Sequence, residues 1–377
     1  MDSRPTERAR LVSLDQFRGY TVLGMFLVNF VGSYDAVATF LPILKHHHTH
    51  VSYADTIMPQ FFLAVGFAYR MTFLRRLEKE GAAAAYWHAT KRILGLLVVA
   101  FVVHTLGSGV ANWEQFRSGQ VWSAVAAGLK REYFQTLTHI AVTSLWVMPV
   151  IAARPGVRVL FMVGSAVPFH VLSHFWYYDW VNLPPKGIDG GPLGFLTWTI
   201  PLIVGTLAYD AMSTSSRPPV GKLLVWGAAL MLTAYVLACL NRVTPPNGLS
   251  AADGWQGIFV EPPFVPPADK ESVNVWTMSQ RSGSVTYQTF GTGFGLAVYA
   301  LFVQACDVGT LSVGIFRTLG TNALAGYILH ELVAAAVKPW VPKDSPLWWV
   351  FLGFALFMGI CYLLLRYLEK HELYLRL

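Results

Sequence analysis

The sequence concentrates reactive side chains in one place, because four of its eleven histidines fall within residues 46–50, in the run HHHTH. Imidazole titrates near neutral pH, so it can take up and release a proton during a reaction. Three interpretations of the run are open: a solvated polar loop, a zinc or copper site, and a catalytic imidazole. Adjacent histidines rarely converge on one ion, and no HExxH or CxxC motif accompanies them, so we expect no metal.

A carboxylate follows the histidines, since Asp55 stands at the start of the next apolar segment. If His46 or its neighbour His47 is a base, this carboxylate can fix the ring tautomer and stabilise the charged ring. Asn29 lies inside the preceding apolar segment and has two interpretations. A polar amide inside a span suggests a functional group, or it can bond to a neighbouring helix.

Other polar groups also fall in or beside apolar segments, where they are costly and therefore suggest function. Asp15 and Arg18 are spaced to form an ion pair on one helix face, and the same pair is suited to binding a substrate. Asn322, Gly326 and His330 are four residues apart and share a helix face, which indicates a tight helix contact or the wall of a cavity.

The elements that must carry these residues are membrane-spanning helices. Of the 377 residues, 54% are hydrophobic and only 13% are charged, about half the charge of an ordinary soluble domain. The apolar residues come in blocks of about 20, the length that crosses a hydrocarbon layer. A soluble enzyme and a disordered chain are therefore excluded. The net charge of +7 fits basic loops that face anionic lipid, and without a basic run interleaved with aromatics we expect no nucleic-acid partner.

The pattern predicts an all-α polytopic membrane protein with about ten transmembrane helices. We expect a short interfacial helix within residues 111–133 and a single domain over residues 1–377. The expected spans are 17–34, 54–74, 91–108, 134–153, 157–176, 195–212, 222–240, 285–305, 315–337 and 346–366.

The distribution of Lys and Arg sets the expected topology. More of them face the cytoplasm when both chain termini are cytoplasmic, which is the bias that membrane proteins show. A long loop, residues 241–284, then faces outward. It is rich in proline and carries Trp255, Phe259, Phe264 and Trp276, so we expect a packed cap over a cavity rather than disorder.

Several segments together resemble a known family. RLVSLDQFRGYTVLGMFLVNF and LKHHHTHVSYADTIMPQFFLAVGFAYR are similar to the first two elements of the heparan-α-glucosaminide N-acetyltransferase family. FQTLTHIAVTSLW, DGGPLGFLTWTIPLIVGTLAYD and LGTNALAGYILHEL resemble later segments of that family. The resemblance touches most of the chain, and the first two elements are its specific part.

The resemblance implies a multi-span transferase that moves an acyl group, usually acetyl, from cytosolic acyl-CoA to an acceptor across the membrane. Its reactive histidine falls on His46, with His47 as the alternative, and its Asn and Asp fall on Asn29 and Asp55. The residues expected to bind substrate are Asp15, Arg18, Gln135, Asn322 and His330. The residues expected to form a basic rim for the phosphates of acetyl-CoA are Arg70, Arg75 and Arg92, although for any single one of them the ordinary cytoplasmic excess of positive charge is the better explanation.

We therefore expect a transmembrane acyltransferase in the inner membrane of a bacterium, which acts on an amino or hydroxyl group of an extracytoplasmic sugar or glycan. Its partners are acetyl-CoA, the acceptor and the lipid bilayer, and a homodimer is compatible with the sequence. The alternative is a secondary transporter of a small polar or anionic solute. Polar groups within spans favour a transporter, whereas the lack of internal repeats opposes it.

Overall fold

The computed structural model describes residues 11–105, 113–119, 122, 125, 128–244, 255–267 and 273–375, and every regular element within these ranges is helical. Segments of π-helix continue α8 over Ser173–Tyr177 and α12 over Val303–Val308. The α-helices are α1 (Val12–Val31), α2 (Asp35–Phe40), α3 (Tyr53–Glu80), α4 (Ala82–Thr105), α5 (Trp113–Arg117), α7 (Thr136–Val147), α8 (Pro155–Leu172), α9 (Tyr178–Asn182), α10 (Phe195–Thr214), α11 (Val220–Val243), α12 (Val285–Phe302), α13 (Gly314–Thr321), α14 (Ala323–Val337) and α15 (Leu347–Lys370).

Seven helices of the described chain are long and apolar enough to cross a membrane. α3, α10 and α12 form the interior, since 61%, 72% and 61% of their most apolar stretches are buried in the protein. α4, α8, α11 and α15 bury only 17% to 28%, and their outer faces expose large apolar side chains such as Leu160, Val225 and Leu363. Helices of this kind are stable when lipid covers those faces. The chain thus has the architecture of a multi-pass integral membrane protein.

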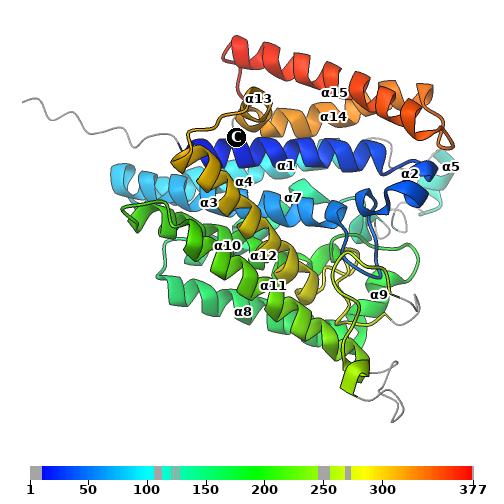
Figure 1. Ribbon diagram of the computed structural model, residues 1–377, viewed down its shortest axis with the longest axis horizontal. Helices are drawn as coiled ribbons and strands as arrows, with labels where there is room; N and C mark the ends of the chain where they lie inside the picture. Colours follow the sequence, from blue (N-terminus) through cyan, green and yellow to red (C-terminus); the bar gives the residue numbers. More distant parts are fainter. Residues whose placement is uncertain are drawn as a thin grey trace, which may run out of the picture.

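The helices run along a common long direction, so the bundle has two ends (Figure 1). The start of α1 and the end of the chain lie at one end, where α3 and α10 also finish. We call this the terminal end. The opposite end carries α2, α9 and residues 41–52, which connect α2 to α3 and include the four histidines. We call it the histidine end.

Three of the ten expected spans differ from long, continuous apolar helices. The first is α1, which begins at Val12 and so includes the ionisable groups of Asp15 and Arg18. The fourth is the short helix α7 followed by a 3-10 turn, Met148–Val150. The ninth is divided, because α13 ends at Thr321 and α14 begins at Ala323.

Two expected features are described only in part. From the expected interfacial helix, α5 exposes Trp113 and Phe116, while most other residues of 111–133 lie outside the described ranges. From the long loop, residues 245–254 and 268–272 and the side chain of Trp255 also lie outside them. The described part of the loop is packed, since Phe264 contacts Phe290 of α12.

The interior helices approach each other closely through glycines. A Cβ atom on Gly66 of α3 would lie 1.9 Å from the carbonyl oxygen of Leu202, and one on Gly205 of α10 would lie 2.1 Å from that of Leu63. Both positions therefore require glycine, as in other membrane helix pairs that bring backbones together. The close contact fixes α10 against α3, and with it the two segments that precede these helices at the histidine end.

Candidate functional site

The first turn of α3 builds the centre of the site through a capping box. The carboxylate of Asp55 accepts hydrogen bonds from the Ser52 backbone N–H at 2.8 Å and from the Ser52 hydroxyl at 2.9 Å. This arrangement satisfies N–H groups that the first turn of a helix leaves without partners. The hydroxyl of Tyr287 on α12 donates to the Asp55 carbonyl oxygen at 2.7 Å, so a second helix also holds this turn in place.

The free oxygen of the same carboxylate binds His46, as the sequence predicts. His46 Nδ1 lies 2.8 Å from Asp55 Oδ1, and Asp55 is 1% exposed, whereas the His46 side chain is 42% exposed. A carboxylate accepts hydrogen bonds, so it favours the tautomer with the proton on Nδ1. The lone pair of His46 Nε2 is then available to accept a proton. A buried carboxylate that orients a partly exposed imidazole is a general-base arrangement.

The surroundings of His46 change its pKa. Burial of the ring lowers it, but the hydrogen bond and negative charge of Asp55 raise it more, and the charge of Asp189 adds to the increase. The pKa of His46 therefore lies above the usual value for histidine, 6.5. The imidazole remains charged to a higher pH than in water, and this favours the imidazolium that a general base becomes.

The other histidines of the run have different partners. His47 Nε2 lies 3.0 Å from the Pro42 carbonyl oxygen, and the His47 ring stacks on His50 at 4.4 Å. His50 Nδ1 lies 3.0 Å from the Thr49 hydroxyl. Within the described part of the chain, His46 is thus the member of the run whose ring is hydrogen-bonded to a carboxylate. The sequence left His46 and His47 open as the reactive histidine, and the structure pairs the ring of His46, not that of His47, with Asp55.

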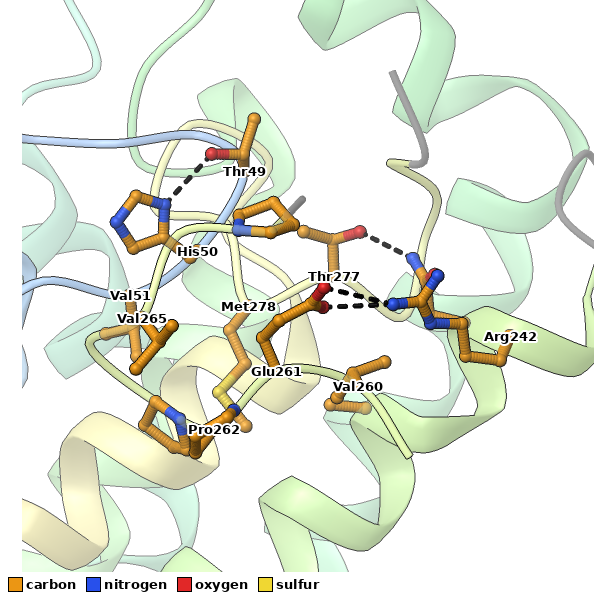
Figure 2. A pocket seen from close by; sticks show the side chains of 14 residues that line it. Thr49, His50, Val51, Arg242, Val260, Glu261, Pro262, Val265, Thr277 and Met278 are labelled. Atoms are coloured by element: carbon orange, nitrogen blue, oxygen red, sulfur yellow. Dashed lines mark hydrogen bonds and ion pairs between the residues drawn. The ribbon is translucent and has the colours of Figure 1, made fainter. Parts of the chain in front are cut away.

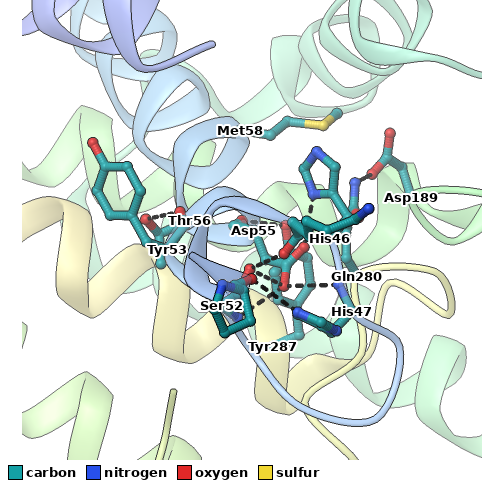
Figure 3. A network of polar contacts seen from close by, with 12 residues as sticks. His46, His47, Ser52, Tyr53, Asp55, Thr56, Met58, Asp189, Gln280 and Tyr287 are labelled. Atoms are coloured by element: carbon teal, nitrogen blue, oxygen red, sulfur yellow. Dashed lines mark hydrogen bonds and ion pairs between the residues drawn. The ribbon is translucent and has the colours of Figure 1, made fainter. Parts of the chain in front are cut away.

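A second carboxylate lies beside this pair, and the sequence analysis assigned it no role. Asp189 belongs to the loop before α10 and is 3% exposed, and its Oδ1 accepts a hydrogen bond from Gln280 Nε2 at 2.9 Å. Figure 3 shows the His46 ring with Asp55 on one side and the Asp189–Gln280 pair on the other. The sequence feature that could have identified Asp189 is the composition of its loop. Asp189 precedes two glycines and a proline at the start of an apolar segment.

Close packing of glycines holds Asp189 in position. Asp189 itself has φ 55° and Gly190 has φ 83°, values in the left-handed region that cost energy for a residue other than glycine. A Cβ atom on Gly283 would lie 2.7 Å from the Gly190 Cα. The Trp198 indole N–H also donates to the Asp189 carbonyl oxygen at 2.9 Å. The loop is thus clamped between α10 and the segment before α12.

A cleft that is open to solvent lies next to residues 41–52, which we call the histidine segment (Figure 2). Its walls come from the histidine segment, the end of α11 and the two described parts of the long loop. Its lining is largely apolar, with an ion pair between Arg242 and Glu261 at 3.0 Å. The lining residues include Thr49, His50, Val51, Ala238, Val265 and Met278.

Asn29 and His330, two other predicted site residues, contact each other. The Asn29 amide nitrogen lies 3.4 Å from His330 Nε2, and His330 is 2% exposed and stacks on Phe26. Among the described residues, the side chain of Asn29 has no hydrogen bond to His46. The structure therefore shows the bond to a neighbouring helix that was one of the two interpretations of Asn29, and its functional role stays a prediction.

The remaining candidates for substrate binding are spread over the bundle. Asp15 Oδ1 lies 4.0 Å from Arg18 Nη1 in α1, as expected for the ion pair. Gln135 precedes α7 and donates to Glu132 at 3.3 Å. Asn322 lies in the break between α13 and α14, and its amide donates to the Leu373 carbonyl oxygen at 3.3 Å. None of these contacts joins a candidate to His46. The structure therefore brings His46 and Asp55 into contact, whereas these other candidates lie elsewhere in the bundle.

The three arginines proposed for the phosphate rim have unequal exposure. Arg75 and Arg92 are exposed. Arg70 is 7% exposed and donates to Asp210 Oδ1 at 2.6 Å and to the Ile151 carbonyl oxygen. The same carboxylate accepts a hydrogen bond from the fully buried Arg158. Arg70 therefore belongs to a buried cluster that joins α3, α8 and α10, and this corrects the expectation of an exposed phosphate ligand.

The site thus combines the histidine segment, the first turn of α3, the loop before α10 and the segment before α12. Comparison of the chain with protein-family models and with curated proteins finds no match. An oriented imidazole with an available Nε2, bonded to one buried carboxylate and with a second beside it, is suited to removing a proton from a substrate that enters at the histidine end.

Proposed function

We propose that the protein is a transmembrane acyltransferase that moves an acyl group, in the first place acetyl, from acyl-CoA to an amino or hydroxyl group of a sugar or glycan. The observation that supports this most is the hydrogen bond between His46 and the buried Asp55. The bond leaves Nε2 free to act as a base at the surface of a membrane-embedded bundle. The resemblance of the histidine segment and α1 to the acetyltransferase family supports the same reaction.

The proposed reaction needs one base and no redox partner. His46 Nε2 takes the proton of the acceptor N–H or O–H as the acceptor atom forms a bond to the thioester carbonyl carbon. The carbon–sulfur bond then breaks, and the imidazolium returns the proton to the leaving sulfur, which gives a thiol. Asp55 keeps its charge throughout and stabilises the imidazolium. If the acyl group instead passes through His46 Nε2, the same lone pair serves as nucleophile.

We place the acyl donor on the cytoplasmic side of the membrane and the acceptor on the other. The terminal end would be cytoplasmic, where the exposed Arg75 and Arg92 are available to the phosphates of acetyl-CoA. The histidine end would face outward, in a bacterium toward the outside of the inner membrane. Counting α1, α7 with its 3-10 turn, and α13 with α14 as crossings alongside the seven long helices gives the proposed ten.

The pH dependence of the rate should reveal the base. Because His46 must be neutral to accept a proton and its pKa is raised by Asp55, the rate should fall as the pH drops, with a midpoint above that of a free histidine. Rates measured between about pH 5 and about pH 9 test this, since that interval spans the titration of histidine. A rate that increases toward acid would contradict a base at this position.

The cleft beside the histidine segment is proposed to admit the acceptor. Val265 lines the cleft and is 44% exposed, so Val265→Trp should fill part of it without disturbing the core. We expect this variant to raise the KM for the acceptor by about tenfold, equivalent to about 1.4 kcal/mol, with little change in kcat. Ile258→Trp is the control, because Ile258 is an exposed residue of the same loop outside the cleft lining. An equal effect of both substitutions would assign the cleft no role.

The test of the proposed function is a direct assay of the purified protein in detergent, with acetyl-CoA and a panel of amino sugars. We expect release of free CoA that depends on the sugar, together with an acetylated sugar. The transporter alternative predicts neither product. Saturable uptake of an intact solute into protein-containing vesicles, without CoA release, would contradict the proposed enzyme and support the transporter.

A further inference from the structure

We propose that Asp189 is a second functional carboxylate of the site, a positioning residue that acts on the imidazole of His46 by its charge and helps it hold the proton removed from the acceptor. This inference rests on the proposed function for its catalytic meaning. Its physical core, the electrostatic effect of Asp189 on His46, does not depend on acyl transfer. The two can therefore be tested separately.

The position of Asp189 supports this role. It is 3% exposed, and a carboxylate is seldom buried to this extent unless it is paired or functional. The side chain of Gln280 donates a hydrogen bond to Asp189 Oδ1 at 2.9 Å. Figure 3 places the pair beside the His46 ring, on the side away from Asp55. The backbone around it is held in left-handed conformations by close glycine contacts, and such strain persists where the surrounding structure fixes it.

The electrostatic environment makes Asp189 responsive near neutral pH. Burial raises the pKa of Asp189 to about 7, although the hydrogen bond from Gln280 and the charges of His46 and Arg131 lower it. The charge of Asp55 acts in the opposite direction and raises it. The charges of Asp189 and His46 thus each favour the charged form of the other.

The consequence for the reaction concerns where the proton is held. When His46 Nε2 receives the acceptor proton, the ring becomes an imidazolium between two carboxylates, Asp55 at Nδ1 and Asp189 on the other side. The two negative charges stabilise that intermediate state. The proton then passes to the departing sulfur, and His46 and Asp189 return to their initial states. No atom or electron is gained or lost by Asp189.

The test measures the titration of His46 without any substrate. Diethyl pyrocarbonate modifies neutral imidazole, and fragment-ion mass spectrometry assigns the label to His46, whose side chain is 42% exposed. Rates of labelling against pH give the midpoint of His46 in the wild type and in Asp189→Asn, which can keep the hydrogen bond to Gln280. We expect Asp189→Asn to lower the midpoint by about one pH unit, the effect of removing a nearby opposite charge.

The matched control is Asp179→Asn, since Asp179 is an exposed carboxylate of α9 and should leave the midpoint unchanged. An unchanged midpoint in folded Asp189→Asn would overturn the proposal. If that variant does not fold, Gln280→Leu serves instead, because loss of the donor disfavours the ionised Asp189 and should lower the His46 midpoint in the same direction. Its failure to do so would also overturn the proposal. If Asp189→Asn does not lower the His46 midpoint, only the role of Asp189 is contradicted. If the wild type transfers no acyl group, the proposed function is contradicted.

Discussion

Replacing His46 by alanine is expected to reduce the rate of acyl transfer by about 10²- to 10⁴-fold, the usual contribution of a general base. The effect should appear in kcat, because the imidazole accepts the proton during the chemical step and does not bind the acyl donor. The side chain is 42% exposed and its hydrogen bond to Asp55 is made from a loop, so the bundle should fold without it. The measurement is the initial rate of CoA release at saturating acetyl-CoA.

His47→Ala is the matched control for this substitution. His47 precedes the same helix, but its ring is bonded to the Pro42 carbonyl oxygen and stacks on His50. We expect its removal to change the rate by less than about threefold, a difference below 1 kcal/mol. If His47→Ala abolished transfer and His46→Ala did not, the base would be His47 and the hydrogen bond to Asp55 would be structural.

Asp210→Ala is expected to destabilise the folded protein by about 3–5 kcal/mol, the usual cost of breaking a buried ion pair by removing one partner. Asp210 accepts hydrogen bonds from Arg70 and from Arg158. Arg158 is fully buried, so the substitution leaves its guanidinium charge without a carboxylate inside the bundle. Thermal unfolding of the purified protein in detergent measures the loss.

Glu80→Ala is the control for the buried cluster. Glu80 pairs with Arg76 at 3.3 Å, and both side chains are 42% exposed, so this ion pair should contribute less than about 1 kcal/mol. The unfolding temperature of Glu80→Ala should lie close to that of the wild type. Equal effects of Asp210→Ala and Glu80→Ala would show that the interior cluster does not join α3, α8 and α10 as described.

The sequence predicts the part of the site that local chain geometry determines. Ser52 and Asp55 have the spacing of a capping box, and a helix that begins there brings the carboxylate back toward the histidines a few residues earlier. Asp189 could not be found in this way. It reaches His46 only because α10 packs against α3 through Gly66 and Gly205, and a sequence pattern along one segment does not specify which helices become neighbours.

Two other expectations show the same limit. In the sequence, Arg70 is one of several basic residues near the end of an apolar segment. Its burial depends on Asp210, 140 positions away. The span expected over 315–337 was predicted as one continuous helix, yet it is divided at Asn322. Composition predicted the membrane helices well where they are long and apolar, and it failed where tertiary contacts determine the local backbone.

Transfer of an acyl group across the membrane by His46 can be measured directly with the purified protein in lipid vesicles. Acetyl-CoA labelled in the acetyl group is placed on one side of the membrane and glucosamine on the other. We expect labelled N-acetylglucosamine on the glucosamine side for the wild type and almost none for His46→Ala. Acetylation at equal rates by both proteins, or no labelled product with the wild type, would contradict it.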